Sequence, residues 1–342
     1  MTISRRKREH VDIALKRDVA FRDKTSGFEA WDFVHCALPE AAFDAVDTRV
    51  EFLGRGLSFP FMVSAMTGGF RGAADINRRL AEVCQTEKIA LGVGSQRQAF
   101  ENDRHLETFR VVRRLAPDIP VVGNIGASEI TRLSDFSPVE AMVDLVSADA
   151  MAVHLNPLQE LLQPEGNRDF SGVLAAITRL TAALSVPVIV KEVGCGISTD
   201  TARRLVEAGV SWIDVAGSGG TSWTGIESHR GGRGRIAAAF WDWGIPTAVS
   251  IRMVRSVPGA SIIASGGIRN GLEAAKAVAL GAELCGAAMP VLRSLDAGPN
   301  GLVRLISEWR DQFRAVLYLT GSRACADLRR PGVLRYAKSE AP

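Results

Sequence analysis

Eight short apolar segments recur along the chain, and this repetition limits its fold more than any other feature. Most of them end in or next to glycine, serine, alanine or asparagine. The segments are residues 59–66, 89–95, 119–124, 150–154, 187–191, 212–217, 261–266 and 283–288. Apolar runs that do not alternate with polar residues are typical of parallel strands buried on both faces of a sheet.

Helical patterns separate these segments. Between residues 75 and 88, Ile76, Leu80, Val83 and Cys84 recur at the spacing of one helical face. Ser198 is placed to cap a helix that glycine ends, and residues 271–281 form an alanine-rich helix closed by glycine. Eight strand and helix units predict an α/β protein and favour a closed (β/α)8 TIM barrel over an open doubly wound sheet.

The chain of 342 residues suits one barrel domain with extensions. We expect a single domain over residues 1–342, made of an N-terminal arm (1–57), the barrel (58–298) and a C-terminal helix and tail (299–342). The glycine- and arginine-rich stretch 219–235 is expected to be a mobile loop at the barrel mouth.

Composition argues against several classes of protein. The 41 Lys and Arg nearly balance the 38 Asp and Glu, so we expect neither nucleic-acid nor membrane binding, although a basic run at residues 5–8 keeps a nucleic-acid binder as a rival hypothesis. Five scattered cysteines form no zinc or disulfide pattern and fit a cytoplasmic protein. The first thirty residues lack the apolar core of a cleavable signal.

Polar side chains follow most of the apolar segments. In a barrel the carboxyl ends of all strands share one face, where active sites are built, so these side chains are expected to meet there. They include Thr67, Ser95, Gln96, Arg97, Asn124, His154, Lys191 and Thr221, joined by the small residues Gly266, Gly267, Ala287 and Ala288.

Two of these strand ends indicate an anionic ligand. Residues 265–269 and 286–288 follow the seventh and eighth strands, where barrels commonly bind phosphate through backbone N–H groups. Lys191 ends an apolar run and requires an anionic partner or a shifted pKa, and a flavin would satisfy both requirements. Arg97 is either a phosphate ligand or a solvated side chain.

The fourth segment ends in an unusual group of polar residues, His154, Asn156, Gln159 and Glu160. Glu160 is a candidate Mg²⁺ ligand with water and phosphate oxygens completing the shell. The same residues also read as a helix start, with Asn156 as N-cap, Pro157 at the first position and Gln159 completing a capping box. The residues by themselves leave both interpretations open.

Together these motifs closely resemble type 2, flavin-dependent isopentenyl diphosphate isomerases. The resemblance runs from Arg6 to about Arg323, and the segments around residues 95–97 and 154–160 are its most specific parts. Its motifs are RKREH at residues 6–10, SAMTGG at 64–69, GVGSQR at 92–97, GNIG at 123–126, HLNPLQE at 154–160, GGTSW at 219–223 and SGGIR at 265–269.

The resemblance implies an FMN barrel that interconverts isopentenyl and dimethylallyl diphosphate in isoprenoid biosynthesis, with Mg²⁺ and with NADPH as flavin reductant. The implied FMN contacts are Ala65, Met66, Thr67, Ser95, Asn124, Lys191, Thr221, Gly267, Ile268, Arg269, Ala287 and Ala288. The implied substrate contacts are Arg6, Lys7, Ser95, Gln96, Arg97, His154 and Gln159. It also implies that Glu160 binds the metal and that the protein forms a homo-oligomer, a tetramer or octamer.

Moving an unactivated double bond requires a proton donor and a proton acceptor, and the residues at the mouth include no strong acid. Reduced FMN is expected to supply both, with Gln159 and His154 as the catalytic side chains beside it. Ala216 replaces a serine that family members often use to contact the flavin. The basic arm is expected to act as a lid over its own mouth or a neighbour's.

Another FMN-dependent TIM-barrel oxidoreductase is the alternative. An α-hydroxy acid oxidase should carry a catalytic histidine and arginine near the seventh strand, and a nucleotide dehydrogenase should carry a nucleophilic cysteine after the sixth. Residues 217–221, which follow the sixth strand, contain only Gly, Ser and Thr. Cys195, the remaining candidate nucleophile, lies in a glycine-flanked turn.

Overall fold

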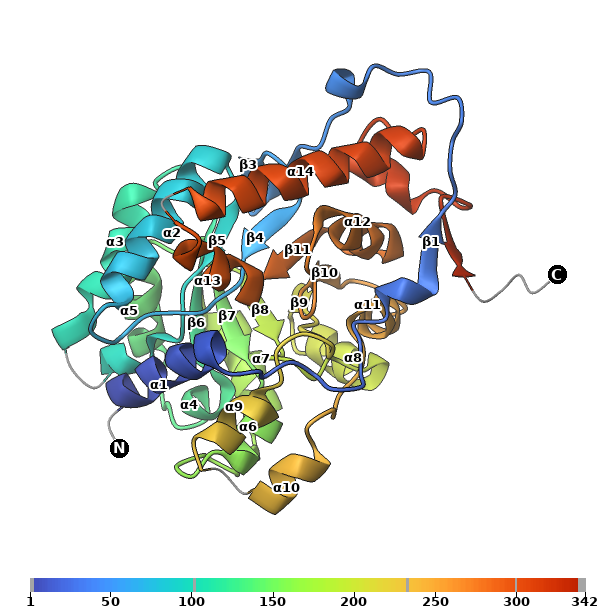
Figure 1. Cartoon of the computed structure of the whole chain (residues 1–342). Helices are drawn as coiled ribbons and strands as arrows, with labels where there is room; N and C mark the ends of the chain where they lie inside the picture. Colours follow the sequence, from blue (N-terminus) through green and yellow to red (C-terminus); the bar gives the residue numbers. More distant parts are fainter. Residues whose placement is uncertain (1–2, 101–102, 232–233, 299, 338–342) are drawn as a thin grey trace.

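Eight parallel strands close into a barrel in a computed structural model that describes residues 3–100, 103–231, 234–298 and 300–337. The last strand pairs with the first through Ala287 and Val63, so the predicted (β/α)8 barrel is confirmed (Figure 1). The strands are β4 (Phe61–Val63), β5 (Ala90–Gly92), β6 (Val121–Gly126), β7 (Ala150–His154), β8 (Val188–Lys191), β9 (Trp212–Asp214), β10 (Ser261–Ala264) and β11 (Leu284–Ala287).

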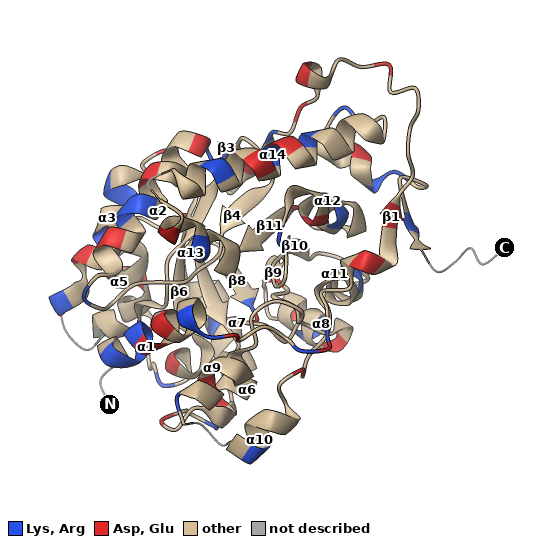
Figure 2. Cartoon of the chain, in the orientation of Figure 1, with Lys and Arg blue, Asp and Glu red and all other residues tan. Residues whose placement is uncertain are grey.

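Helices surround the barrel and connect its strands (Figure 1). They are α2 (Ala73–Glu87), α3 (Glu107–Leu115), α4 (Ala127–Ile130), α5 (Ser137–Val146), α6 (Pro157–Leu162), α7 (Val173–Ala183), α8 (Thr199–Glu207), α9 (Trp223–His229), α10 (Gly234–Ala239), α11 (Thr247–Arg255), α12 (Gly271–Leu280) and α13 (Met289–Asp296). Short 3₁₀ turns occur at Phe28–Ala30, Phe43–Ala45, Gln96–Phe100, Asp103–His105 and Cys325–Arg329. Figure 2 shows charges of both signs interspersed on the outer helices.

Local sequence signals explain several helix ends. The Ser198 hydroxyl accepts the backbone N–H of Thr201 at the start of α8, as predicted. Gly281 ends α12 with a φ of 124°, a conformation that other residues rarely adopt. On α2, Leu80 and Cys84 are buried against the barrel, which confirms the predicted apolar stripe.

A hairpin of β2 (Val50–Phe52) and β3 (Arg55–Leu57) closes the amino end of the barrel. Phe52 and Leu57 are buried against strand residues inside the barrel such as Met62 and Ile189. Arg55 forms an ion pair with Asp149, just before β7, with 2.8 Å between Nε and Oδ1. Because this end is filled, a ligand can enter only at the carboxyl ends of the strands.

Both ends of the chain pack onto the barrel. Helix α1 (Ile3–Lys16) packs against α9 and α13, and α14 (Gly301–Leu319) packs against α2, α12 and α13 (Figure 1). Strand β1 (Trp31–Phe33) pairs antiparallel with β12 (Leu334–Tyr336), so the arm and the tail meet. Within the described residues, no helix has both the length and the apolar character needed to cross a membrane.

The mobile loop expected over residues 219–235 was a wrong prediction, because much of this stretch is helical. Ser222 caps α9 by accepting the backbone N–H of Gly225, and Ile226 is buried in that helix. Helix α10 begins at Gly234, while residues 232 and 233 lie outside the described residues. The glycine and arginine content suggested a loop, but the segment contains a capped helix that is stabilised by packing of its apolar face on other elements.

Candidate active site at the barrel mouth

A cavity of about 490 Å³ opens at the carboxyl ends of the strands, within the size range of small-molecule sites. Its walls come from the loops that follow the strands and from the inner face of α1. The predicted cofactor residues that line it are Ala65, Met66, Lys191, Thr221, Gly267, Ile268, Arg269, Ala287 and Ala288. Ala216 also lines it, with a positive φ of 35°.

The features of this cavity fit a flavin with a phosphate group. The buried hydroxyl of Ser64 faces the cavity and has no hydrogen-bond partner among the described residues. Gly267 has a φ of 75°, and a Cβ there would lie 2.9 Å from the carbonyl carbon of Gly219, so only glycine allows this approach of two backbones. Lys191 supplies a positive charge at the end of β8.

Three predicted cofactor residues, Thr67, Ser95 and Asn124, are not among the residues that line the cavity. The Thr67 hydroxyl donates to the buried side chain of Asn77. The Ser95 carbonyl accepts a hydrogen bond from Lys7, and the Asn124 side chain contacts His154. Ser95 and Asn124 thus contact residues at the mouth, whereas Thr67 is held by a buried side chain.

His154 lies at the centre of a cationic group. Its Nδ1 is 2.9 Å from Oδ1 of Asn124, so this nitrogen carries the proton and Nε2 keeps a lone pair. Burial first, and then the charges of Lys191, Lys7, Arg6 and Arg97, lower the pKa of His154 to about 3. Four cations near one neutral imidazole form an environment suited to a multiply charged anion.

The basic arm brings two of these cations to the mouth from the first helix. Lys7 donates to the carbonyl of Gly68 at 2.9 Å and to that of Ser95, which follow β4 and β5. Arg6 is paired with Glu165 at 3.9 Å, and burial followed by the charge of Arg97 lowers its pKa. Helix α1 therefore covers the mouth of its own barrel.

Two further predicted substrate residues differ in accessibility. Arg97 is partly exposed and pairs with Glu129 at 3.0 Å. Gln96 is fully buried, its amide donating to the carbonyl of Met142 and accepting the N–H of Asn124. Both polar atoms of the Gln96 side chain are therefore engaged within the protein, and the substrate contact at Gln96 stays a prediction.

Helix α6 begins at Pro157, as predicted, but the predicted capping box is wrong. The Asn156 side chain makes no hydrogen bond to the helix backbone. Its Nδ2 donates instead to Oε1 of Gln159 and to Oε1 of Glu160, both at 3.1 Å. Asn156 therefore orients the two side chains that the sequence singles out, and all three are buried.

Glu160 offers a carboxylate without a cage of further protein ligands. Its Oε2 accepts the backbone N–H of Asn167 at 2.5 Å. Over the part of the chain that the structure describes, no cluster of three or more His, Cys, Asp or Glu side chains could hold a metal ion. A Mg²⁺ ion bound by one carboxylate, water and phosphate oxygens remains compatible with this donor set.

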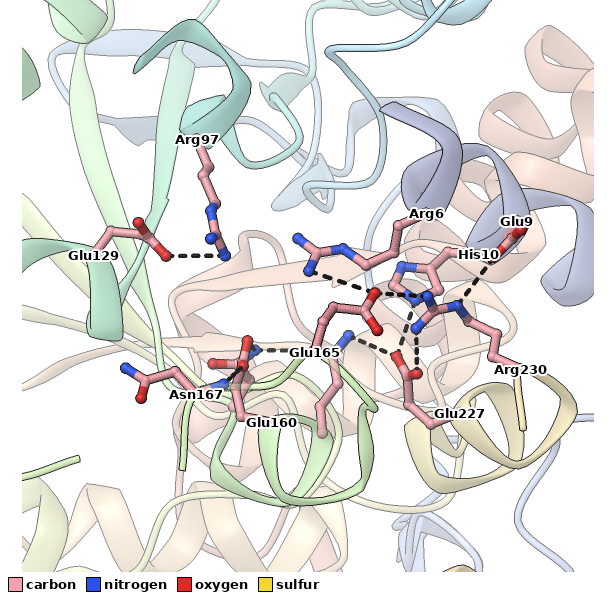
Figure 3. A network of polar contacts seen from close by, with 12 residues as sticks. Arg6, Glu9, His10, Arg97, Glu129, Glu160, Glu165, Asn167, Glu227 and Arg230 are labelled. Carbon is pink, nitrogen blue, oxygen red and sulfur yellow. Dashed lines mark hydrogen bonds and ion pairs between the residues drawn. The ribbon is translucent and has the colours of Figure 1, made fainter. Parts of the chain in front are cut away.

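Sequence reasoning missed several residues that complete the mouth. Glu227 of α9 accepts from Gln159 Nε2 at 3.4 Å and lies 2.9 Å from His10 Nε2, while Arg230 pairs with it at 2.6 Å (Figure 3). Although burial opposes it, hydrogen bonding from His10 and the charge of Arg230 lower the pKa of Glu227. No local pattern marks these residues, because their partners come from distant segments.

Glu192 is a second carboxylate that the sequence reasoning did not select. It follows Lys191, and its Oε2 accepts the backbone N–H groups of Val193, Gly194 and Cys195. Burial raises the pKa of Glu192 to about 7, against the opposing effect of these hydrogen bonds. Glu192 thus holds the loop whose residues 193 and 194 line the cavity.

This fold and site define a flavin-type barrel, and comparison with known proteins agrees. The model of the FMN-dependent dehydrogenase family matches residues 1–103 and 166–335. A flavocytochrome b2 mutant has a TM-score of 0.71 at 18% identity, covering 98% of this chain and 85% of that chain. A mandelate oxidase mutant has a TM-score of 0.62 at 18% identity, covering 96% and 91%. These distant structures share the fold.

Much more similar relatives carry a single name, isopentenyl-diphosphate delta-isomerase. The protein from Cronobacter sakazakii is 46% identical over 99% of both chains. The one from Synechococcus sp. is 47% identical over 98% of this chain and 97% of its own, and the one from Methanothermobacter thermautotrophicus is 44% identical over 97% and 93%. The chain belongs to the isopentenyl-diphosphate delta-isomerase family.

Proposed function

We propose that this protein interconverts isopentenyl diphosphate and dimethylallyl diphosphate. The observation that carries the proposal is that four cationic side chains lie near enough to His154 to lower its pKa, and that two of them, Lys7 and Lys191, line the cavity. The relatives of this chain are named for this reaction. The diphosphate would bind where Arg6, Lys7, Arg97 and the Ser95 segment meet. The buried Gln96 would act indirectly, because its side-chain oxygen accepts the backbone N–H of Asn124.

The hydrocarbon end of the substrate would then point into the cavity. FMN would be held by the residues that line it, with Thr67, Ser95 and Asn124 supporting them. When bound in its reduced form, FMN supplies the proton donor and acceptor that this shift requires. Overall, one proton is added at the terminal methylene carbon and one is lost from C2, so the reaction has no net redox change.

The residues of the chain would position the reacting carbons and keep water away. Gln159 is held by Asn156 and Glu227, so its amide has a defined direction at the mouth. His154 would contact the diphosphate, and together with Gln159 it forms our proposed catalytic pair. Glu160 would hold Mg²⁺, and the ion would neutralise part of the charge of the diphosphate.

The remaining parts of the proposal concern the setting of the reaction. NADPH would reduce the flavin. The protein would act in the cytoplasm as a homo-oligomer of four or eight chains. The scattered cysteines support the cytoplasm, and the family resemblance supports the other two.

The test is direct. The purified protein should be yellow and, when reduced anaerobically with Mg²⁺, should convert isopentenyl diphosphate to its isomer. Reconstitution with 5-deaza-FMN should remove most of this activity because N5 is then replaced by carbon. A colourless protein, or a reduced holoenzyme that produces no dimethylallyl diphosphate, would refute the proposal. Oxidation of lactate or mandelate instead would favour the oxidoreductase alternative.

A further inference from the structure

Arg230 lies at the end of α9, and its guanidinium group contacts three carboxylates. Nη1 is 2.6 Å from Oε2 of Glu227, Nη2 is 2.8 Å from Oε1 of Glu165, and Nε is 3.4 Å from Oε2 of Glu9 (Figure 3). The Arg230 side chain is only 2% exposed. Such a buried, planar group with several donors imposes a geometry on its partners that a lysine would not.

The three carboxylates come from three separate segments. Glu9 belongs to the covering helix α1, Glu165 follows α6, and Glu227 belongs to α9. Arg6 of α1 also pairs with Glu165, so α1 is tied to this group at two points. Arg230 therefore connects α1 to α9 and to the segment that follows α6, the helix that carries Gln159 and Glu160.

Glu227 transmits the effect of Arg230 to the site. Its Oε2 binds Arg230, while its Oε1 faces Gln159 Nε2 and His10 Nε2. Rotation of this fully buried carboxylate would therefore disturb the amide of Gln159 and the contact to α1 together. His10 also packs edge-on against Trp223, at 5.2 Å between ring centroids, which adds a further contact between α1 and α9.

We propose that Arg230 is a positioning residue that couples closure of α1 over the mouth to the orientation of Glu227 against Gln159. This proposal rests on the proposed isomerase function for its kinetic consequence, but its structural part does not. The simpler alternative is that Arg230 only stabilises the fold. The positioning role and the stabilising role predict different results, because stabilisation alone changes neither the accessibility of α1 nor the kinetic constants per flavin-loaded enzyme molecule.

The principal variant is Arg230→Gln in the holoenzyme, with Arg78→Gln as the matched control. Arg78 also lies between two carboxylates, Asp75 and Glu82, but on the exposed surface of α2. Tryptic cleavage within the first sixteen residues, followed by mass spectrometry as the release of N-terminal fragments, reports whether α1 covers the mouth. Kinetic constants for isopentenyl diphosphate are expressed per bound flavin.

We expect Arg230→Gln to release the N-terminal fragment faster, to raise KM by about tenfold or more and to lower kcat, since charged hydrogen bonds are lost at both Glu9 and Glu227. Arg78→Gln should match the wild type in all three measurements. Arg230→Lys should recover only part of the loss, because one ammonium group cannot match the three-way geometry.

A second variant, Glu9→Gln with Glu165→Gln, keeps the proposal testable if Arg230→Gln does not fold. It weakens the attachment of α1 but leaves the contact between Arg230 and Glu227, so fragment release and KM should rise while kcat falls less than in Arg230→Gln. Unchanged fragment release and unchanged KM in either variant would overturn the proposal. If the wild-type enzyme has no isomerase activity, the proposed function fails, whereas fragment release still tests the closure of α1.

Discussion

The neutral state of His154 should make the stability of this protein fall in mild acid. Burial and four nearby cations lower the pKa of His154 from 6.5 to about 3. Burial and the nearby cations are absent in the unfolded chain, so below about pH 6.5 the imidazole is protonated in the unfolded state but not in the folded state. The stability linked to His154 is therefore fully present above pH 6.5 and is lost as the pH falls toward 3.

The size of this loss of stability follows from the pH interval over which His154 is protonated only in the unfolded state. Since one pKa unit corresponds to about 1.36 kcal/mol, lowering the pH from 7 to 5 should cost about 2 kcal/mol of unfolding free energy through His154 alone. Substitution with asparagine removes the titrating group. His154→Asn should therefore lose about 2 kcal/mol less than the wild type over the same interval.

Urea unfolding at pH 7 and pH 5, followed by tryptophan fluorescence at one fixed FMN concentration, measures this difference. The comparison between the two proteins removes the contributions of all other titrating groups that they share. His35→Asn changes an exposed histidine and controls for the loss of an imidazole as such. Equal losses in the wild type and in His154→Asn would refute the claim that the cationic group keeps His154 neutral.

Four other predictions test the site. Substrate binding should take up a proton at pH 7, because the diphosphate needs a hydrogen-bond donor at His154 Nε2 and its negative charge offsets the surrounding cations. Calorimetry in buffers of different ionisation enthalpy measures this proton uptake. The uptake should vanish in His154→Asn. Glu160→Gln should abolish the Mg²⁺ dependence and most turnover, and an unchanged Mg²⁺ titration would reject the metal assignment. Gly267→Ala should weaken FMN retention by about tenfold or more, because a Cβ at this positive φ would crowd Gly219 and distort the turn proposed to bind the FMN phosphate. Gly56→Ala, with open space around its Cβ, should leave FMN retention unchanged. Gel filtration followed by flavin absorbance measures the retained FMN. Removal of residues 1–8 should raise KM for the diphosphate, and an unchanged KM would identify the arm as a solvated tail.

Local patterns predicted the regular elements well, because burial on both faces of a parallel sheet leaves continuous apolar runs in the sequence. The predicted strand at residues 150–154 coincides with β7, and Pro157 begins α6 as expected. The errors arose where one sequence signal served two purposes. Asn156 was assigned to a helix cap but orients Gln159 and Glu160, and Ser222 caps a helix within a stretch that looked like a loop.

The sequence by itself therefore determined the barrel, the position of its mouth and several of the strand-end residues that line it, because each of these follows from local periodicity and from the shared direction of parallel strands. Only the tertiary structure decided how helix α1 is attached over the mouth of the barrel. The contact between His10 and Glu227 joins residues 217 positions apart, and Arg230 draws its three carboxylates from separate segments. Interactions over such distances leave no periodic trace in a single sequence, since they depend on how finished helices pack together.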